Sequence, residues 1–204
     1  MAKLYFHYST MNAGKSTILL QAAHNYQERG MQTYLLTAKL DDRAGAGRIA
    51  SRIGIGQPAE TFTPDDDLFA RIAARLKAGP CACIFIDEAQ FLDDGIIPVV
   101  NDLADRGVRV ILSGTDMDFR GMPFGPIPGL LAIAEQVDKL HAICVRCGEL
   151  ATRNQRLLDG LPAPAEGPTI QVGGSEHYEA RCRRCHEVPP IYRDQTSLLD
   201  SPEP

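Results

Sequence analysis

The chain has 204 residues, of which 44% are hydrophobic, and its formal net charge is −5. This length accommodates one ordinary domain and a small appendage, and the composition is that of a globular protein with a buried core. No stretch of about 18 or more apolar residues occurs, and the acidic balance gives no electrostatic footprint for a nucleic-acid backbone, so we expect neither membrane nor nucleic acid as partner. The N-terminus lacks the layout of a signal peptide, which predicts a cytoplasmic protein.

The first part of the chain alternates strand and helix patterns. We predict a strand over Ala2–Tyr8, a helix over Ser16–Arg29 that ends at Gly30, and a buried strand over Gln32–Ala38. The next stretch, Leu40–Gln57, is polar, contains several glycines and shows no steady period. A loop of that length is either mobile or functional.

The alternation continues through the middle of the chain. A helix is predicted from Pro64 to Gly79, followed by a fully apolar strand over Cys81–Ile86. Another helix is expected within Gly95–Arg106, and the strand Val108–Leu112 comes after it.

A loop separates these elements from the last helix and strand. Phe119–Gly129 is crowded with glycine and proline and is predicted to be irregular. A short helix over Leu130–Gln136 and a strand over Val137–Cys144 follow. Strands that are apolar on both faces and alternate with helices are typical of a parallel sheet covered on each side, so the predicted class is α/β.

A phosphate-binding loop is indicated between the first strand and the first helix, where Ser9 to Ser16 spell S-T-M-N-A-G-K-S. In this layout backbone N–H groups and the positive end of the helix dipole face the phosphates. Lys15 adds a positive charge, and the Ser16 hydroxyl is placed to ligate Mg²⁺. Ser9 departs from the usual pattern, which has glycine at its position. The alternative interpretation is a chance Gly-Lys-Ser at a helix start, since serine and threonine are ordinary capping residues.

Two acids follow the apolar strand C-A-C-I-F-I. Asp87 stands where a Walker B aspartate belongs and is predicted to hold Mg²⁺, because ligands of such sheets sit beyond the carboxyl ends of the strands. Glu88 is a candidate to accept a proton from an attacking hydroxyl. The alternative for Asp87 is a carboxylate that only marks the end of a strand. The alternative for Glu88 is a solvated loop carboxylate.

Four of the six cysteines form two C-x-x-C pairs separated by 34 residues, namely Cys144, Cys147, Cys182 and Cys185. This spacing predicts a closed structural zinc site, with Gly148 allowing the first turn to close. Two disulfides are the alternative, which a reducing cytoplasm disfavours, and His186 is a possible substitute ligand for Cys185. The other two, Cys81 and Cys83, are expected to behave as buried hydrophobes.

Taken together, several motifs resemble those of type II (cytosolic-type, zinc-containing) thymidine kinases, from about residue 3 to Tyr192. The motifs are M-N-A-G-K-S-T at Met11–Thr17, D-D-R at Asp41–Arg43, D-E-A-Q-F at Asp87–Phe91, D-F-R-G-M-P-F-G at Asp118–Gly125, V-G-G-S-E-H-Y at Val172–Tyr178, and the paired C-x-x-C. The Asp-Glu-Ala-Gln tetrad also resembles helicases, but those need two such cores, roughly 300–400 residues.

The resemblance implies a P-loop NTPase core with a small zinc-ribbon-like lasso domain. It implies transfer of the ATP γ-phosphate to the 5′-hydroxyl of thymidine, and of deoxyuridine, to give dTMP, with Glu88 as general base, Ser16 and Asp87 holding Mg²⁺, and ATP, Mg²⁺ and structural Zn²⁺ as cofactors. The implied ATP-binding residues are Ser9, Thr10, Met11, Asn12, Ala13, Gly14, Lys15, Ser16, Arg43, Asp87, Glu88, Ala89 and Gln90.

In the family, a lasso between the cysteine pairs closes over the base and reads it mainly through main-chain groups. The implied thymidine-binding residues are Met11, Phe91, Phe119, Phe124, Val172, Gly173 and Tyr178. For any one phenylalanine, core packing is the alternative. Thr115 departs from the leucine expected near the base pocket.

The predicted organisation is a nucleotide-binding core over 1–140, a zinc-binding lasso domain over 141–193 and a disordered tail over 194–204. The resemblance implies a homotetramer. A second function class stays open, in which a single ATPase core uses its zinc ribbon to dock nucleic acid or protein. ATP turnover with and without thymidine separates the two.

Overall fold

A six-stranded parallel sheet forms the centre of the computed structural model, which describes residues 3–40, 45, 47–166, 168–170 and 178–188. Its order is β5-β2-β6-β7-β1-β8, and every neighbouring pair runs parallel. The strands are β1 Leu4–Tyr8, β2 Thr33–Ala38, β5 Glu60–Phe62, β6 Cys83–Ile86, β7 Arg109–Gly114 and β8 Gln136–Lys139. The predicted α/β class is confirmed.

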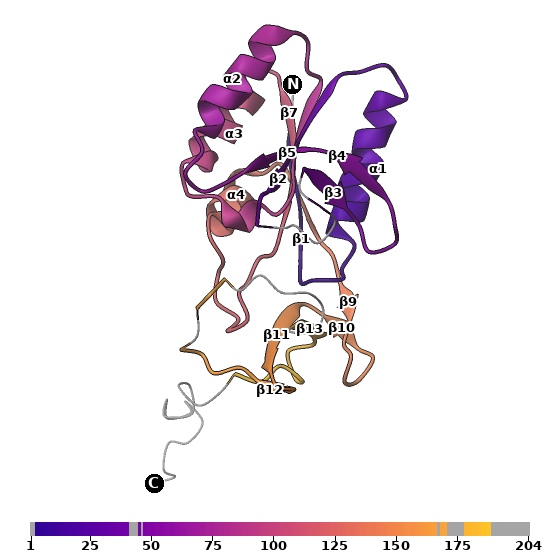
Figure 1. Cartoon of the computed structure of the whole chain (residues 1–204), viewed down its shortest axis with the longest axis vertical. Helices are drawn as coiled ribbons and strands as arrows, with labels where there is room; N and C mark the ends of the chain where they lie inside the picture. The colour runs from indigo at the N-terminus through magenta and orange to yellow at the C-terminus, as the bar shows by residue number, and fades with distance from the viewer. Residues whose placement is uncertain (1–2, 41–44, 46, 167, 171–177, 189–204) are drawn as a thin grey trace.

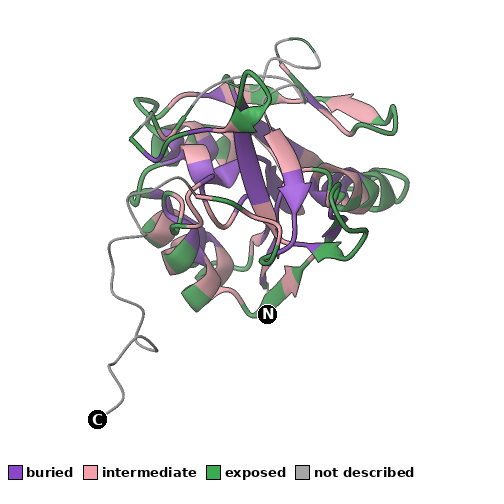
Figure 2. Ribbon diagram, turned by 90° about the horizontal axis from the view of Figure 1, so that it is seen from below, coloured by how far each residue is buried: buried purple, intermediate pink, exposed green. Residues whose placement is uncertain are grey.

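Helices cover both faces of this sheet (Figure 1). Helix α1, Lys15–Gln27, lies on one face, and α2 Leu68–Ala78, α3 Ile96–Asp105 and α4 Ile127–Ile133 lie on the other. Successive side chains of β6 point to opposite faces of the sheet and so pack against different helices. Cys83 and Phe85 pack toward α1, whereas Ile84 and Ile86 pack toward the other three helices. The exposure map shows the resulting buried centre (Figure 2).

The predicted loop over Leu40–Gln57 is wrong in part. Two short strands, β3 Arg48–Ala50 and β4 Gly56–Pro58, pair antiparallel there, and β4 extends one residue beyond the predicted loop. Ile49 is fully buried against α1 and anchors the hairpin. β5 was also not predicted, because three-residue strands carry too little alternation to be recognised.

The predicted boundaries around α4 are also wrong. The helix begins at Ile127, inside the segment Phe119–Gly129 expected to be a loop, and it ends at Ile133. Pro128 stands in its first turn, where proline is tolerated because the N–H groups there have no helical partner.

The expected strand Val137–Cys144 is divided between two sheets. β8 ends at Lys139, and the chain then leaves the central sheet to form β9, Ala142–Ile143, which pairs with β10, Leu150–Ala151. The sequence carries no glycine or proline at this division, so its pattern continues without interruption.

A second, smaller lobe begins at β9, below the carboxyl ends of the central strands (Figure 1). It contains the β9–β10 ribbon and a three-stranded antiparallel sheet of β12 Leu161–Pro162, β11 Arg153–Leu158 and β13 Tyr178–Arg181. Its small apolar cluster consists of Ala142, Cys144, Ala151, Ala180 and Cys182. Among the described residues, no helix is long and apolar enough to cross a membrane.

Candidate active site and metal site

The phosphate-loop segment, residues 9–16, connects the carboxyl end of β1 to the first turn of α1. Asn12 and Gly14 have left-handed backbones, with φ of 64° and 85°. Left-handed residues in a tight turn curve the chain so that successive N–H groups converge on an anion. Only glycine adopts such a φ without steric cost, which explains Gly14 directly before α1.

Lys15 is held over this loop. Its side chain is 7% exposed, and its Nζ donates a hydrogen bond to the Thr10 carbonyl at 2.9 Å. The cationic head therefore lies beside the backbone that would surround a phosphate chain.

Asp87 lies at the carboxyl end of β6 and is 2% exposed. Its carboxylate accepts hydrogen bonds from the Ser113 and Ser16 hydroxyls and from the Glu88 N–H, the last at 3.0 Å. Burial, reinforced by the nearby Glu88 carboxylate, raises the pKa of Asp87 to about 6, against the lowering effect of these hydroxyls and of Lys15. The contact with Ser16 brings together the two predicted Mg²⁺ ligands. A carboxylate and a hydroxyl are the oxygen donors that this ion takes.

Glu88 is held in a left-handed conformation with φ 56°, which is rare for a residue other than glycine. Its side chain is 8% exposed, and the Gln90 side-chain amide donates a hydrogen bond to its Oε2. Gln90 Oε1 in turn accepts from the Thr115 backbone N–H at 2.9 Å. Gln90 thus contacts the candidate base, and Thr115 fixes the orientation of that amide.

The predicted aromatic wall divides into two environments. The rings of Phe91 and Phe124 meet edge to face, with centroids 5.9 Å apart. Phe119 is instead 4% exposed, with the guanidinium groups of Arg120 and Arg156 at 5.6 Å and 5.1 Å from its ring centroid. Of the three predicted wall residues, Phe91 and Phe124 therefore form a ring pair, and Phe119 packs with cations instead.

The loop that carries Phe119 is ordered around a buried carboxylate. Asp118 accepts hydrogen bonds from the Arg120 and Met122 N–H groups at 2.9 Å and 3.0 Å, and from Arg120 Nε at 2.7 Å. Gly121, with φ 80°, lies so close to Arg153 that a Cβ there would be 2.3 Å from that guanidinium. The loop is therefore fixed against the second lobe.

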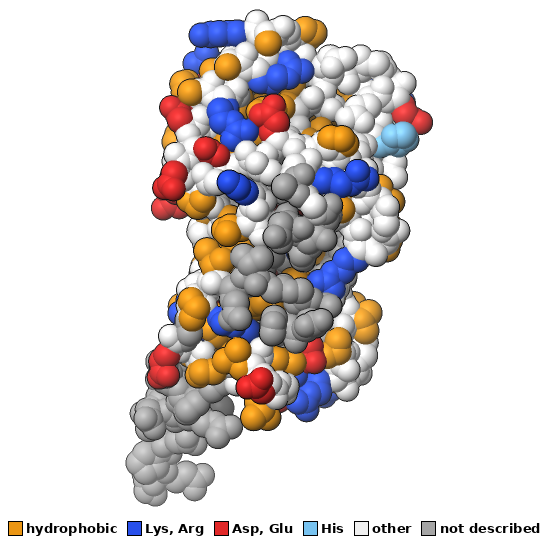
Figure 3. All heavy atoms as spheres, in the orientation of Figure 1, with side chains coloured by type: hydrophobic (Ala, Val, Ile, Leu, Met, Phe, Trp, Pro, Cys, Tyr) orange, Lys and Arg blue, Asp and Glu red, His pale blue; other side chains and the backbone are white. Residues whose placement is uncertain are grey.

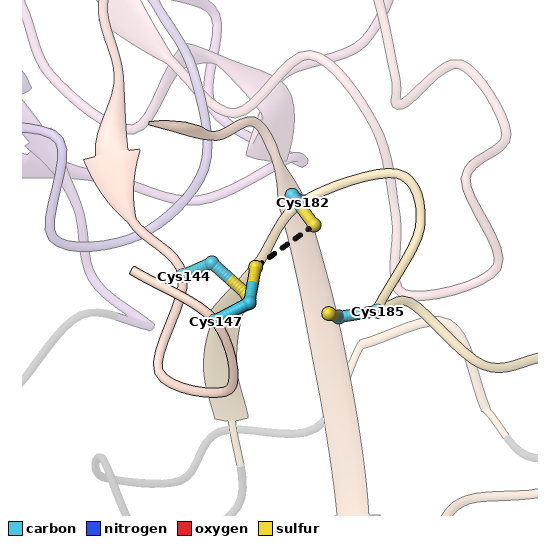
Figure 4. Close-up of side chains that lie close together, drawn as sticks. All are labelled: Cys144, Cys147, Cys182 and Cys185. Carbon is cyan, nitrogen blue, oxygen red and sulfur yellow. Dashed lines mark hydrogen bonds between the residues drawn. The ribbon is translucent and has the colours of Figure 1, made fainter. Parts of the chain in front are cut away.

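The four cysteines of the two C-x-x-C pairs converge (Figure 4). All four Sγ atoms lie within 4.8 Å of one another, and Cys147 Sγ is 3.6 Å from Cys182 Sγ. A tetrahedral zinc with bonds of about 2.3 Å places its sulfur ligands roughly 3.8 Å apart, so the donor set fits zinc. The first pair follows β9 and the second follows β13, and Gly148 has the left-handed φ of 75° expected for the first turn.

His186 belongs to a different set of contacts. Its Nε2 is 2.8 Å from the Phe119 carbonyl oxygen, and its ring also bonds the Asn154 main chain. Burial lowers the pKa of this imidazole. These contacts, and the absence of His186 from the group of converging sulfurs, favour Cys185 as the fourth ligand.

Not every predicted site residue can be placed. Arg43, Val172 and Gly173 lie outside the described residues. Met11 is half-buried in the phosphate loop, and Tyr178 is half-buried in β13, opposite Arg156. Of the other two predicted apolar cysteines, Cys83 is fully buried and Cys81 half-buried. Ser113 and Asn154 contact the site but carry no motif that sequence reasoning recognises.

The phosphate loop after β1 and the buried acid after β6 lie at one edge of a parallel sheet, and this arrangement defines the class of P-loop nucleotide-binding proteins, here with an added four-cysteine lobe. The family model described as "Thymidine kinase" matches residues 2–186. The chain belongs to the thymidine kinase family.

Individual relatives agree with that membership. A thymidine kinase of Jannaschia sp. is 55% identical over 90% of this chain and 94% of its own length. One of Ruegeria pomeroyi is 54% identical over 90% and 93%. One of Rhodopirellula baltica is 41% identical over 100% of this chain and 98% of its own.

Proposed function

We propose that this protein transfers the γ-phosphate of ATP to the 5′-hydroxyl of thymidine, and of deoxyuridine, giving dTMP and ADP. The observation that carries the proposal is that Lys15 and Glu88 both lie near the Asp87 carboxylate, beyond the carboxyl ends of β1 and β6, in a chain of the thymidine kinase family. In this reaction the 5′-oxygen forms a bond to the γ-phosphorus, the bond from that phosphorus to the β,γ-bridging oxygen breaks, and the hydroxyl proton passes to a base.

Glu88 is the proposed base. Its buried carboxylate is oriented by Gln90, and proton acceptance by a positioned carboxylate is ordinary general-base chemistry. Lys15 supplies positive charge to the transferred group, and phosphoryl transfer depends mainly on such positioning and charge stabilisation. Mg²⁺, which Ser16 and Asp87 would hold, neutralises phosphate charge when bound.

The remaining assignments are proposals of the same kind. We assign ATP contacts to Ser9–Ser16, Arg43 and Asp87–Gln90, and thymidine contacts to Met11, Phe91, Phe119, Phe124, Val172, Gly173 and Tyr178. Zinc would be structural, because four thiolates close its coordination. The division into a core over 1–140, a lasso domain over 141–193 and a tail over 194–204 and the cytoplasmic location are further proposals. The homotetramer is a proposal that rests on family resemblance alone. The tail lies outside the described residues.

The alternative, an ATPase module that docks nucleic acid, is disfavoured by charge. On the face shown in Figure 3, basic and acidic side chains are interspersed over the upper lobe, and the whole chain is acidic. A nucleic-acid backbone is bound by clustered cations.

A coupled kinase assay across the deoxynucleosides tests the proposal. Thymidine and deoxyuridine should be phosphorylated well. Deoxycytidine should be at least ~10²-fold worse in kcat/KM, because its amine and unprotonated N3 would leave at least two polar groups unpaired in a site that matches thymine. ATP turnover that thymidine does not stimulate would reject the kinase, and equal kcat/KM for deoxycytidine would reduce it to a general deoxynucleoside kinase.

A further inference from the structure

The second lobe touches the phosphate loop through one buried side chain, Asn154 of β11. Its Oδ1 accepts two hydrogen bonds, one from the Thr10 hydroxyl and one from the Met11 backbone N–H, the latter at 2.9 Å. Asn154 is 6% exposed, so these contacts do not compete with bulk water. One carbonyl oxygen thus satisfies two adjacent donors of the loop.

The same loop also has an apolar contact with this lobe. Ala13 packs against the small cluster that contains Cys144 and Cys182. The main chain of Asn154 is fixed in turn by the His186 ring, which follows the second cysteine pair. The loop is therefore held from the second lobe at two points, one polar and one apolar.

We propose that Asn154 is a positioning residue for the phosphate loop, which fixes the loop in its nucleotide-binding shape without contacting the reacting atoms. Because the Met11 N–H is bonded to Asn154, that N–H is not available to a phosphate, and Met11 would contact ATP through other atoms. This inference rests on the proposed function, since the ligand concerned is the triphosphate of ATP.

The choice of asparagine over aspartate has a chemical reason. Aspartate offers the same two-donor acceptor geometry, but it adds a negative charge beside a loop that must receive a polyanion. Leucine has nearly the same size and offers no acceptor. The variants Asn154→Asp and Asn154→Leu therefore separate the charge of this residue from its hydrogen bonding.

Direct binding of the non-hydrolysable ATP analogue AMP-PNP with Mg²⁺, measured by calorimetry without nucleoside, tests the proposal on the full zinc-loaded chain. Asn154→Leu should raise its Kd by ~10-fold or more, because two loop donors lose their partner. Asn154→Asp should also raise it, and added salt should reduce that loss, because salt screens charge repulsion. The KM for ATP should rise more than the KM for thymidine.

Gln155→Leu is the matched control. Gln155 is the next residue of β11 and equally buried, but its hydrogen bonds go to Arg156, Arg181 and Glu187. The Gln155→Leu variant should have lower thermal stability, but its Kd for AMP-PNP should stay within about 2-fold of the wild-type value, since Gln155 contacts no donor of the phosphate loop.

If Asn154→Leu does not fold, the variant Thr10→Val tests the same contact from the loop. It removes one of the two donors from which Asn154 accepts, so it should also raise the Kd of AMP-PNP, and an unchanged Kd in Thr10→Val would count against the proposal. Unchanged Kd in a folded Asn154→Leu protein, or a rise in the thymidine KM alone, would overturn the proposal. If the wild type does not phosphorylate thymidine, the proposed function is rejected. The Kd of AMP-PNP in the Asn154 variants would still test the role of Asn154.

Discussion

Gln90 and Thr115 both help to orient Glu88, which follows the end of β6. Gln90 donates to its carboxylate, and Thr115 holds the Gln90 amide from the end of β7. Glutamine at position 88 keeps the shape and the polar contact but cannot take up a proton at neutral pH. We expect Glu88→Gln to lower kcat by ~10²–10⁴-fold.

Nucleotide binding separates this role from a structural one. The Kd of AMP-PNP should be nearly unchanged in Glu88→Gln, since the carboxylate is assigned to the nucleoside hydroxyl. A variant with wild-type kcat would remove Glu88 from the mechanism.

We expect the ionised Asp87 carboxylate to lower the free energy of unfolding at neutral pH. Its pKa is raised from 3.8 to about 6, mainly by burial, so its favourable contribution is complete below about pH 4 and is lost as the pH rises through 6. In Mg²⁺-free buffer, Asp87→Asn should therefore be more stable than the wild type near pH 7.5, by on the order of 1–3 kcal/mol, and nearly equal near pH 4.

Urea unfolding at the two pH values measures this difference. The exposed Asp94→Asn controls for the loss of one negative charge. The same stability gain at both pH values would show that deprotonation of Asp87 is not its source. Phosphoryl transfer should fall in Asp87→Asn despite the added stability, because the variant lacks the carboxylate that we propose as a Mg²⁺ ligand.

Sequence reasoning identified site residues where their chemistry follows a fixed spacing. Lys15, Asp87 and the four cysteines belong to motifs whose geometry is local. The structure places Lys15 beside the loop after β1, Asp87 directly after β6 and the four sulfurs together. Asn154 and Ser113 were missed, since each reaches the site across a large sequence separation and neither stands in a motif.

At the scale of elements, the loop before α4 and the 3₁₀ turn η1, Ala89–Phe91, are in close contact. Gly125 has φ 52°, and a Cβ there would lie 2.4 Å from the Gln90 carbonyl oxygen. Gly125→Ala should destabilise the fold by ~1–3 kcal/mol and raise the thymidine KM, because it pushes apart the segments that carry Phe91 and Phe124.

Gly107→Ala is the control for backbone strain alone. Gly107 also has a positive φ, 87°, but a Cβ there would meet no atom within 4 Å. Gly107→Ala should lower the free energy of unfolding by only about 1–2 kcal/mol and leave the thymidine KM unchanged. Equal thymidine KM values in the two variants would refute the role of this contact, and chemical denaturation measures both stabilities.

Prediction of the strands succeeded where burial on both faces makes a strand apolar throughout, and it failed for strands of only three residues. β6 and β7 are buried on both faces, so their apolar runs are unmistakable. β3, β4 and β5 have three residues each, and tertiary pairing forms them in place of local preference. The division between β8 and β9 is likewise set by the second lobe.

For the whole molecule, the four-cysteine cluster is the centre of the smaller lobe. Metal analysis should find one zinc per chain. Cys182→Ser should weaken zinc binding and expose the amides of β9 to β13 to hydrogen exchange, while β1, β6 and β7 stay protected, because all four sulfurs lie outside the central sheet.

Cys81→Ser is the matched control, since that thiol lies outside the cluster and should leave zinc content unchanged. Zinc absent from protein purified without chelator would reject the metal site. Simultaneous loss of protection in both lobes would show that the smaller lobe is not separately sensitive to the metal.

The two-point support of the phosphate loop has a consequence for biosynthesis. During synthesis the loop leaves the ribosome well before Asn154 and Cys182, which hold or border it. A nascent chain that ends at Lys139 already contains all six central strands, and domains generally fold from the N-terminus during synthesis. Its phosphate loop would still lack both contacts. Competence to bind ATP should therefore arise only after the smaller lobe has been synthesised, so that a product terminated before that lobe would fold its sheet without sequestering cellular nucleotide.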